Sequence, residues 1–242
     1  MTEVPTSSLG KAEIDQLLER HDQSDAAAAA AFFSFESPQS FIAARDADGT
    51  VTPLIGFWPL PVRGNDLLEA IAGIDENGER LVANYQNAFP ELTGAIRAFG
   101  SELEPMESES LGWLLAACSL TLGMQDEDVA RALGPVSSLV KVDTVVVEHD
   151  GRYVLDSRRL LRSVMSYRIG AVPNHALARS VFESLGDYAA NAVRRLLRDW
   201  KADVVVCAGD LFARNRFIAD RTRLGLVQPG LRVLFPAVAD EA

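Results

Sequence analysis

The segment Cys207-Ala208-Gly209-Asp210 has residue types that could hold a ligand, because it follows the apolar run Asp203–Cys207. Such a run is typical of a strand that is buried on both faces. A glycine after a buried parallel strand lets the backbone approach a ligand closely, and the next helix start, near Arg214 and Asn215, offers N–H groups that favour anions. Asp210 could instead bind a ribose hydroxyl or a metal. A tight turn in which Asp210 caps the helix is the commoner structure for such a segment.

The other polar residues form weaker patterns. His21, His149 and His175 have no histidine or cysteine at the spacing of metal ligands, so we expect them on the surface. Asp46 and Asp48 resemble the start of a calcium loop, but its twelfth position is Phe57 instead of glutamate, which favours a simple turn.

Charged clusters occur in three places. The glutamates of the segment 101–110 suggest a solvated acidic loop, with a cation patch or a docking surface as alternatives. Two arginine groups could each hold a carboxylate or a phosphate, although solvated surface charge is the simpler interpretation. These groups are Arg158, Arg159 and Arg162, and Arg194, Arg195 and Arg198.

Composition excludes several classes of protein. The 242 residues carry a net charge of −11, which is unsuited to holding a phosphate backbone, and no basic helix-turn-helix is visible. Cys118 and Cys207 form no C-x-x-C motif, and no nucleophile elbow, Walker motif or dinucleotide-binding motif occurs. No apolar run approaches the roughly 18–20 residues of a membrane span, and the N-terminus does not resemble a secretory signal. The expectation is a cytoplasmic protein that binds neither nucleic acid nor membrane.

The N-terminal residues 1–38 differ from the rest of the chain. Glu13–His21 has apolar residues at helical spacing, and Ser8 could cap this helix. The alanine run Ala26–Ala31 also favours a helix. Residues 1–38 are therefore predicted to be a helical arm, and residues 39–242 a separate unit.

The middle of the chain predicts two hairpins and several helices. Asp-Gly turns lie between Phe41–Ala44 and Val51–Trp58, and between Thr144–Glu148 and Arg152–Leu155. The expected helices are Leu67–Ile74 capped by Asp66, Glu91–Phe99, the apolar Leu111–Met124, Asp126–Leu133, Arg158–Tyr167 capped by Asp156, and Asn174–Trp200 with a break or bend near Gly186.

The C-terminal part reads as strand, loop, helix and strand. The strand Asp203–Cys207 is followed by a helix at Arg214–Leu224 and a final strand at Leu231–Phe235. This order predicts a βαβ unit with a parallel strand pair, and hence an α/β fold.

Four segments, in order, resemble the carbamoyltransferase region of the hydrogenase maturation protein HypF, which is itself similar to tRNA threonylcarbamoyladenosine synthases. They are Phe41–Gly49 with Trp58-Pro-Leu-Pro-Val-Arg-Gly-Asn-Asp66, Ser110–Met124, Tyr153–Leu185, and Val204–Ile218. The resemblance implies the second lobe of an actin-like ATPase fold, also described as ribonuclease H-like. It also implies a nucleotide site that would include Gly64, Asp66, Gly209, Asp210 and Asn215.

The chain departs from this family at the residues that matter most for catalysis. The phosphate-binding S-G-G becomes Ala208-Gly209-Asp210, which places a negative charge where phosphate would lie. An arginine, an aspartate and a histidine that are typical of the family are replaced here by Trp113, Ala116 and Glu183. The family's first lobe, which carries its metal-binding histidines, has no counterpart in the sequence.

The resemblance therefore predicts a non-catalytic accessory or scaffold protein of [NiFe] hydrogenase maturation or assembly. It would hold no metal or cofactor, and any binding of ATP or carbamoyl-adenylate would be a remnant. An exposed lobe face would bind a partner protein, either a hydrogenase subunit or a maturation factor, or a second copy of the chain. The alternative is a carbamoyltransferase subunit whose partner chain supplies the first lobe.

Overall fold

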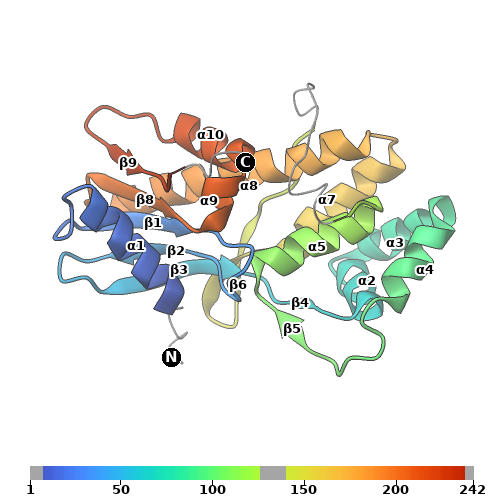
Figure 1. Cartoon of the computed structure of the whole chain (residues 1–242). Coiled ribbons are helices and arrows are strands. Elements are labelled where there is room, and N and C mark those ends of the chain that lie inside the picture. The colour runs from blue at the N-terminus through green and yellow to red at the C-terminus, as the bar shows by residue number, and fades with distance from the viewer. Residues whose placement is uncertain (1–7, 126–139, 238–242) are drawn as a thin grey trace.

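The computed structural model describes residues 8–125 and 140–237, and a mixed seven-stranded sheet lies at its centre. The strand order is β6-β7-β3-β2-β1-β8-β9, and a separate two-stranded ribbon pairs β4 with β5 (Figure 1). The strands are β1 (Ala28–Phe32), β2 (Phe41–Arg45), β3 (Val51–Phe57), β4 (Leu60–Pro61), β5 (Glu107–Ser108), β6 (Val146–His149), β7 (Arg152–Leu155), β8 (Val204–Ala208) and β9 (Arg232–Leu234).

Helices cover both faces of the sheet and form a further group beside it. Figure 1 shows α1 against one face, and α2 to α5 with α7 gathered to the right of the sheet. The helices of the described residues are α1 (Ser8–Arg20), α2 (Gly64–Ala72), α3 (Glu76–Ala88), α4 (Pro90–Ala98), α5 (Leu111–Leu122), α7 (Ser157–Ile169), α8 (Asn174–Asp199), α9 (Asp210–Arg214) and α10 (Arg216–Gly225). No helix of the described residues is long and apolar enough to cross a membrane.

The alanine run forms a strand, so the prediction of a helix there is wrong. Strand β1 pairs in parallel with β8 and antiparallel with β2, and all of its residues are buried. The helix propensity of alanine is a weak preference that pairing along both strand edges overrides. Residues 28–32 therefore lie inside the sheet and are not part of a helical arm. The division of the chain at residue 38 into two domains stays a prediction.

The side chains of β1 alternate between two hydrophobic layers. Ala28, Ala30 and Phe32 pack with the apolar face of α1, whereas Ala29 and Ala31 belong to the larger core that contains α8. This alternation is the period of two expected of a strand buried on both faces. Alanine side chains are small, so both helices can approach the sheet closely at β1.

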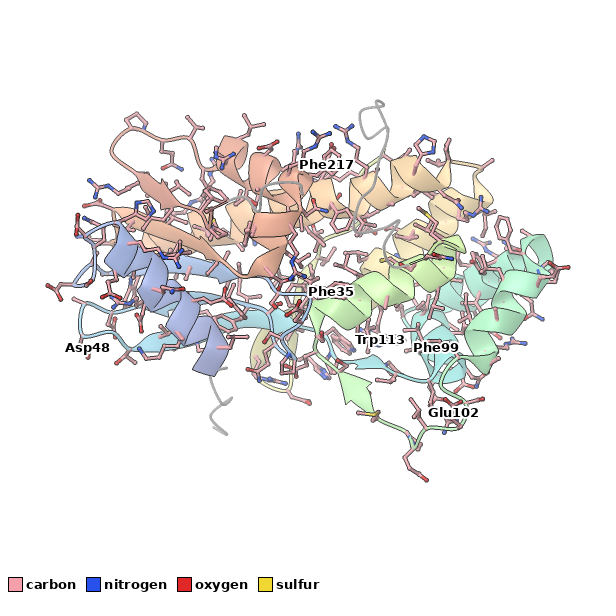
Figure 2. All side chains as sticks on the ribbon, in the orientation of Figure 1. Phe35, Asp48, Phe99, Glu102, Trp113 and Phe217 are labelled. Atoms are coloured by element: carbon pink, nitrogen blue, oxygen red, sulfur yellow. The ribbon has the colours of Figure 1, made fainter. Side chains whose placement is uncertain are left out.

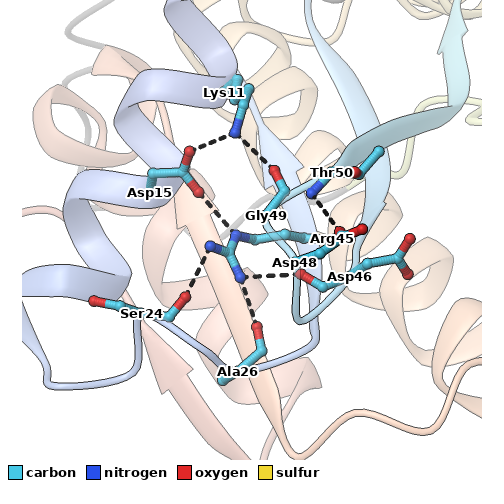
Figure 3. Close-up of polar contacts among 9 residues, drawn as sticks. All are labelled: Lys11, Asp15, Ser24, Ala26, Arg45, Asp46, Asp48, Gly49 and Thr50. Atoms are coloured by element: carbon cyan, nitrogen blue, oxygen red, sulfur yellow. Dashed lines mark hydrogen bonds and ion pairs between the residues drawn. The ribbon is translucent and has the colours of Figure 1, made fainter.

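Arg45, at the end of β2, joins α1 to the sheet (Figure 3). Its side chain is 6% exposed, and its Nε donates to Asp15 Oδ1 at 2.8 Å. Its two terminal nitrogens donate to the carbonyl oxygens of Ser24, Ala26 and Asp46. Lys11 Nζ connects Asp15 to the Gly49 carbonyl, at 2.7 Å in both cases. Every nitrogen of the buried guanidinium thus has an acceptor, as burial of a charge requires.

Five strands end at the same edge of the sheet. Strands β8 and β9 run parallel to β1, strand β3 is parallel to β1 because both are antiparallel to β2, and β7 is parallel to β3. Ligands of open α/β sheets bind outside the carboxyl ends of the strands. The turn Gly209-Asp210 lies at this edge, directly after β8, and the predicted parallel pair of the C-terminal βαβ unit is confirmed.

The structure confirms most of the other predicted elements and corrects two details. Both Asp-Gly hairpins and the Asp156 cap of α7 are present. The long helix α8 is unbroken at Gly186, where an added Cβ would lie 2.7 Å from the Ile218 carbonyl of α10. This glycine therefore serves close helix packing. Asp66 does not cap α2, and the helix predicted at Asp126–Leu133 lies outside the described residues.

Candidate functional site

Gly209 occupies a backbone position that only glycine fits. Its φ is +102°, and an added Cβ would lie 2.0 Å from the Phe33 carbonyl oxygen. Its N–H donates to Glu13 Oε2 of α1 at 3.0 Å. A carboxylate of the chain itself therefore already takes the backbone donor through which this turn could bind an anion.

Asp210 is the first residue of α9, and its side chain holds the segment that follows β1. Its Oδ1 accepts hydrogen bonds from the Ser34 hydroxyl and from the Phe35 N–H, the latter at 3.0 Å. Its Oδ2 is buried without a hydrogen bond, and the nearest cation is Arg214, 3.7 Å away. The expected role of Asp210 as a helix cap is not found, because no side chain caps α9.

The segment held by Asp210 has a firm internal structure. Ser34 Oγ accepts the N–H groups of Glu36 and Ser37, at 3.2 and 2.9 Å, and Ser40 Oγ accepts the Ser34 N–H at 3.0 Å. Helix α5 packs on the same segment, since a Cβ at Gly112 would lie 2.2 Å from the Phe35 carbonyl oxygen. The segment is therefore fixed from the side of α9 and from the side of α5.

The electrostatics of this site disfavour a bound anion. Burial raises the pKa of the Glu13 carboxyl above its usual value, and the carboxylates of Asp210 and Glu36 raise it further, while the Gly209 N–H lowers it. Arg214 pairs with Glu36 at 3.0 Å and with Asp210 at 3.7 Å, so one cation pairs with two of the three carboxylates. Across the described residues, no three His, Cys, Asp or Glu side chains are gathered closely enough to hold a metal ion.

The remaining predicted site residues have structural partners of their own. Asn215 is 4% exposed and caps α10, where its side chain accepts the N–H groups of Phe217 and Ile218. A Cβ at Gly64 would lie 1.8 Å from the Ile96 carbonyl, so Gly64 allows α2 and α4 to pack closely. Asp66 pairs with Arg63 at 3.1 Å. None of these contacts involves the Gly209 turn.

Another polar group lies at the carboxyl ends of β3 and β7. The Trp58 ring has the Arg158 guanidinium 3.4 Å from its centroid and the His149 ring 3.9 Å from it. Asp156 is 1% exposed, caps α7 and binds Arg158 through both carboxylate oxygens. His149 is thus stacked against tryptophan, whereas His21 and His175 are exposed as predicted. These charges stabilise the edge of the sheet.

The two cysteines do not offer a nucleophile. Both are free and fully buried. Burial raises the pKa of the Cys118 thiol to about 12, and it raises the pKa of Cys207 further. The thiolate is the reactive form of cysteine.

Sequence reasoning missed two residues of the site, Glu13 and Ser34. Glu13 was part of a predicted helix only, and Ser34 stood in the predicted arm. The one local signal is the change from an apolar run to Ser34-Phe-Glu-Ser37, which is typical of a strand end followed by a turn. Nothing local indicates that either residue reaches the Gly209 turn.

Comparison with known proteins identifies the architecture. No family model matches the chain. The structure of full-length HypF in its phosphate- and nucleotide-bound form superposes with a TM-score of 0.67, at 15% identity, over 93% of this chain and 32% of that one. The fold is that of about a third of HypF. HypF of T. kodakarensis gives a TM-score of 0.61, at 16% identity, over 96% of this chain and 33% of that one.

One curated relative is similar in sequence. Protein HydE of Wolinella succinogenes is 28% identical over 173 residues, which is 66% of this chain and 31% of HydE. The chain thus spans about a third of the length of HydE and of the HypF structures. The resemblance to HypF that the four sequence segments indicated is confirmed, and so is the α/β fold class.

Proposed function

We propose that this chain is a non-catalytic HypF-like accessory protein of [NiFe] hydrogenase maturation or assembly, and that it acts by binding a partner protein. The fold of HypF and the sequence similarity to HydE support this setting. The occupied turn at Gly209 supports the non-catalytic role.

The occupation of that turn carries the proposal. By resemblance, Ala208-Gly209-Asp210 stands where HypF has a glycine-rich phosphate loop. In this chain the Gly209 N–H binds Glu13, and the Ser34 hydroxyl and Phe35 N–H bind Asp210. A phosphate would have to displace two carboxylates to use these donors. The residues present therefore do not fit the phosphates of a nucleotide.

Charge repulsion between a bound phosphate and Asp210 supports the non-catalytic role. Two unit charges ~4 Å apart at an effective dielectric near 20 repel by roughly 4 kcal/mol. That energy corresponds to about three orders of magnitude in affinity. A nucleotide would need additional favourable contacts of similar energy to bind despite this repulsion.

Calorimetric titration of the full chain with Mg-ATP tests the proposal. We expect no binding below millimolar concentration for the unchanged chain. Asp210→Gly removes the charge that blocks the loop, so any remnant of the site should gain ten-fold or more in affinity. Asp25→Gly, in an exposed turn, is the matched control with the same change of charge, and it should leave the titration flat. Micromolar binding by the unchanged chain would overturn the non-catalytic role.

The second candidate function is a carbamoyltransferase subunit completed by a partner chain that supplies a first lobe. The observation that favours it is the common edge at which five parallel strands end, where α/β proteins bind their ligands. This function requires Mg-ATP to bind once the partner is present. Titration of the purified complex therefore separates it from the first candidate.

A further inference from the structure

The segment from Phe99 to Trp113 carries an unusual group of exposed apolar side chains. Phe99 is 40% exposed, Leu103 42% and Met106 56%. The Phe99 and Trp113 rings stack with centroids 5.5 Å apart, and Figure 2 shows them side by side near Glu102. We call Phe99, Leu103, Met106 and Trp113 the apolar patch.

The four residues of the apolar patch are joined through one short piece of chain, residues 61–64. Trp113 Nε1 donates to the Pro61 carbonyl at 3.2 Å, and the Val62 N–H donates to the Met106 carbonyl at 2.9 Å. The Phe99 carbonyl accepts the N–H of residue 64 at 3.0 Å. The Leu103 side chain lies 3.4 Å from the Cβ position of residue 100, which itself lies close to the Val62 carbonyl. These contacts hold all four residues of the patch around the segment that includes and follows β4.

Negative charge surrounds the apolar patch. Glu102, Glu104 and Glu107 are all exposed, and none of them takes part in an ion pair with another described residue. Glu109, at the end of the same segment, pairs with Arg152 at 2.9 Å. Arg63, which lies in the segment 61–64 beside the patch, pairs with Asp66. The carboxylates next to the apolar side chains are thus available to a partner.

We propose that the apolar patch and its three glutamates dock a basic, amphipathic segment of a partner protein. Aromatic residues and methionine are enriched in the cores of protein interfaces, and complementary charge at the rim guides the encounter. Leucine or similar side chains of the partner would cover Leu103 and Met106, and its lysines or arginines would face the glutamates. This inference rests on the proposed function for the existence of a partner, and it adds the surface and the chemistry of recognition.

Fluorescence anisotropy with a designed peptide tests the surface. The probe is a fluorescein-labelled 18-residue helical peptide with leucine along one face and lysine elsewhere, titrated with the full chain at physiological salt. A second peptide with serine in place of every leucine keeps the charge and loses the apolar face. We expect the first peptide to bind at least ten-fold more tightly than the second.

Matched variants locate the binding. Leu103→Ser with Met106→Ser should weaken binding ten-fold or more, and the glutamine triple variant at Glu102, Glu104 and Glu107 should weaken it about five-fold and reduce its salt dependence. The controls are Leu224→Ser with Val227→Ser, which are 69% and 77% exposed elsewhere, and the glutamine triple variant at Glu76, Glu79 and Glu91. Both controls should bind within two-fold of the unchanged chain.

Three results would overturn the docking proposal. Equal weakening by the controls would show general attraction to an acidic protein. Equal binding of the serine peptide would remove the role of the apolar side chains. A dimer of the unchanged chain in light scattering, dissolved by the Leu103 and Met106 substitutions, would show that a second copy covers the patch. The peptide titration does not depend on Mg-ATP. The docking proposal can therefore fail while the Mg-ATP titration supports the proposed function, and the Mg-ATP titration can fail while the peptide still binds.

Discussion

Helix α1 contacts the sheet through two charged groups at opposite ends of the strands, and the two differ in kind. At the first residue of β1, Arg45 meets Asp15, Lys11 and several carbonyl oxygens, so opposite charges and full hydrogen bonding compensate its burial. Beyond the last residue of β1, Glu13 and Asp210 accept only N–H and hydroxyl groups. We call these the arginine end and the carboxylate end.

The two ends differ in how completely their buried charges are compensated. The arginine end is a closed network, as expected of residues selected for stability. The carboxylate end leaves Asp210 Oδ2 without a hydrogen bond and raises the pKa of Glu13, although a purely structural turn needs no charge there. Two carboxylates on neutral donors are the arrangement expected if internal groups have taken the place of a bound anion.

Substitution at Gly209 should give the largest effect, because it strikes the backbone of the carboxylate end. In Gly209→Ala, the new Cβ would meet the Phe33 carbonyl oxygen, and the φ of +102° adds strain. We expect a loss of about 4 kcal/mol in the free energy of unfolding, measured by urea denaturation. Gly230→Ala is the matched control, since Gly230 has a φ of +81° and open space around its Cβ position. It should lose only about 1 kcal/mol, and similar losses in both variants would contradict the close approach of Gly209 to Phe33.

Removal of the guanidinium should come next, and it tests whether the arginine end is structural. Arg45→Met removes the donor to Asp15 Oδ1 and to the loop carbonyl oxygens, and leaves Asp15 with Lys11 as its one cation. We expect a loss of about 3 kcal/mol in urea denaturation, with no change in binding of Mg-ATP or of the docking peptide. Arg80→Met, on the exposed face of α3, should change stability by less than about 0.5 kcal/mol. A loss at Arg45 as small as at Arg80 would mean that the network contributes little.

The elements that the sequence predicts correctly depend on local chemistry. Both hairpins follow from Asp-Gly turns between apolar runs, and strand β8 follows from a run of valines. Strand β1 was missed because alanine favours a helix locally, whereas its pairing partner β8 lies far along the chain. The C-terminal strand–loop–helix–strand pattern and the resemblance to HypF still led to the α/β fold despite this error.

The candidate site was predictable only in part, for the same reason. Gly209 and Asp210 were identified because a glycine after a buried strand is a local pattern. Ser34 and Glu13 reach this turn from 176 and 196 residues away, and no spacing rule connects residues so far apart. Asn215, Gly64 and Asp66 were placed in the site by resemblance, but their contacts are those of caps, helix packing and an ion pair. The sequence alone shows that Asp210 brings a negative charge to this turn. It does not show that the Ser34 hydroxyl and the Phe35 N–H bind this carboxylate.

The smallest effect concerns Glu13 and depends on pH. Its pKa in the folded protein lies above the usual 4.5, so the folded state binds more protons than the unfolded state between these two values. The free energy of unfolding of the native chain should therefore fall as the pH rises through this window. Glu13→Gln keeps an acceptor for the Gly209 N–H and has no charge, so it should gain stability relative to the native chain on the same rise in pH. Asp15→Asn, at the arginine end, should show the opposite trend, because Lys11 and Arg45 hold the pKa of Asp15 below its usual value. Urea titrations at several pH values from 3 to 7 measure both trends, and equal slopes for the two variants would remove the distinction between the two ends.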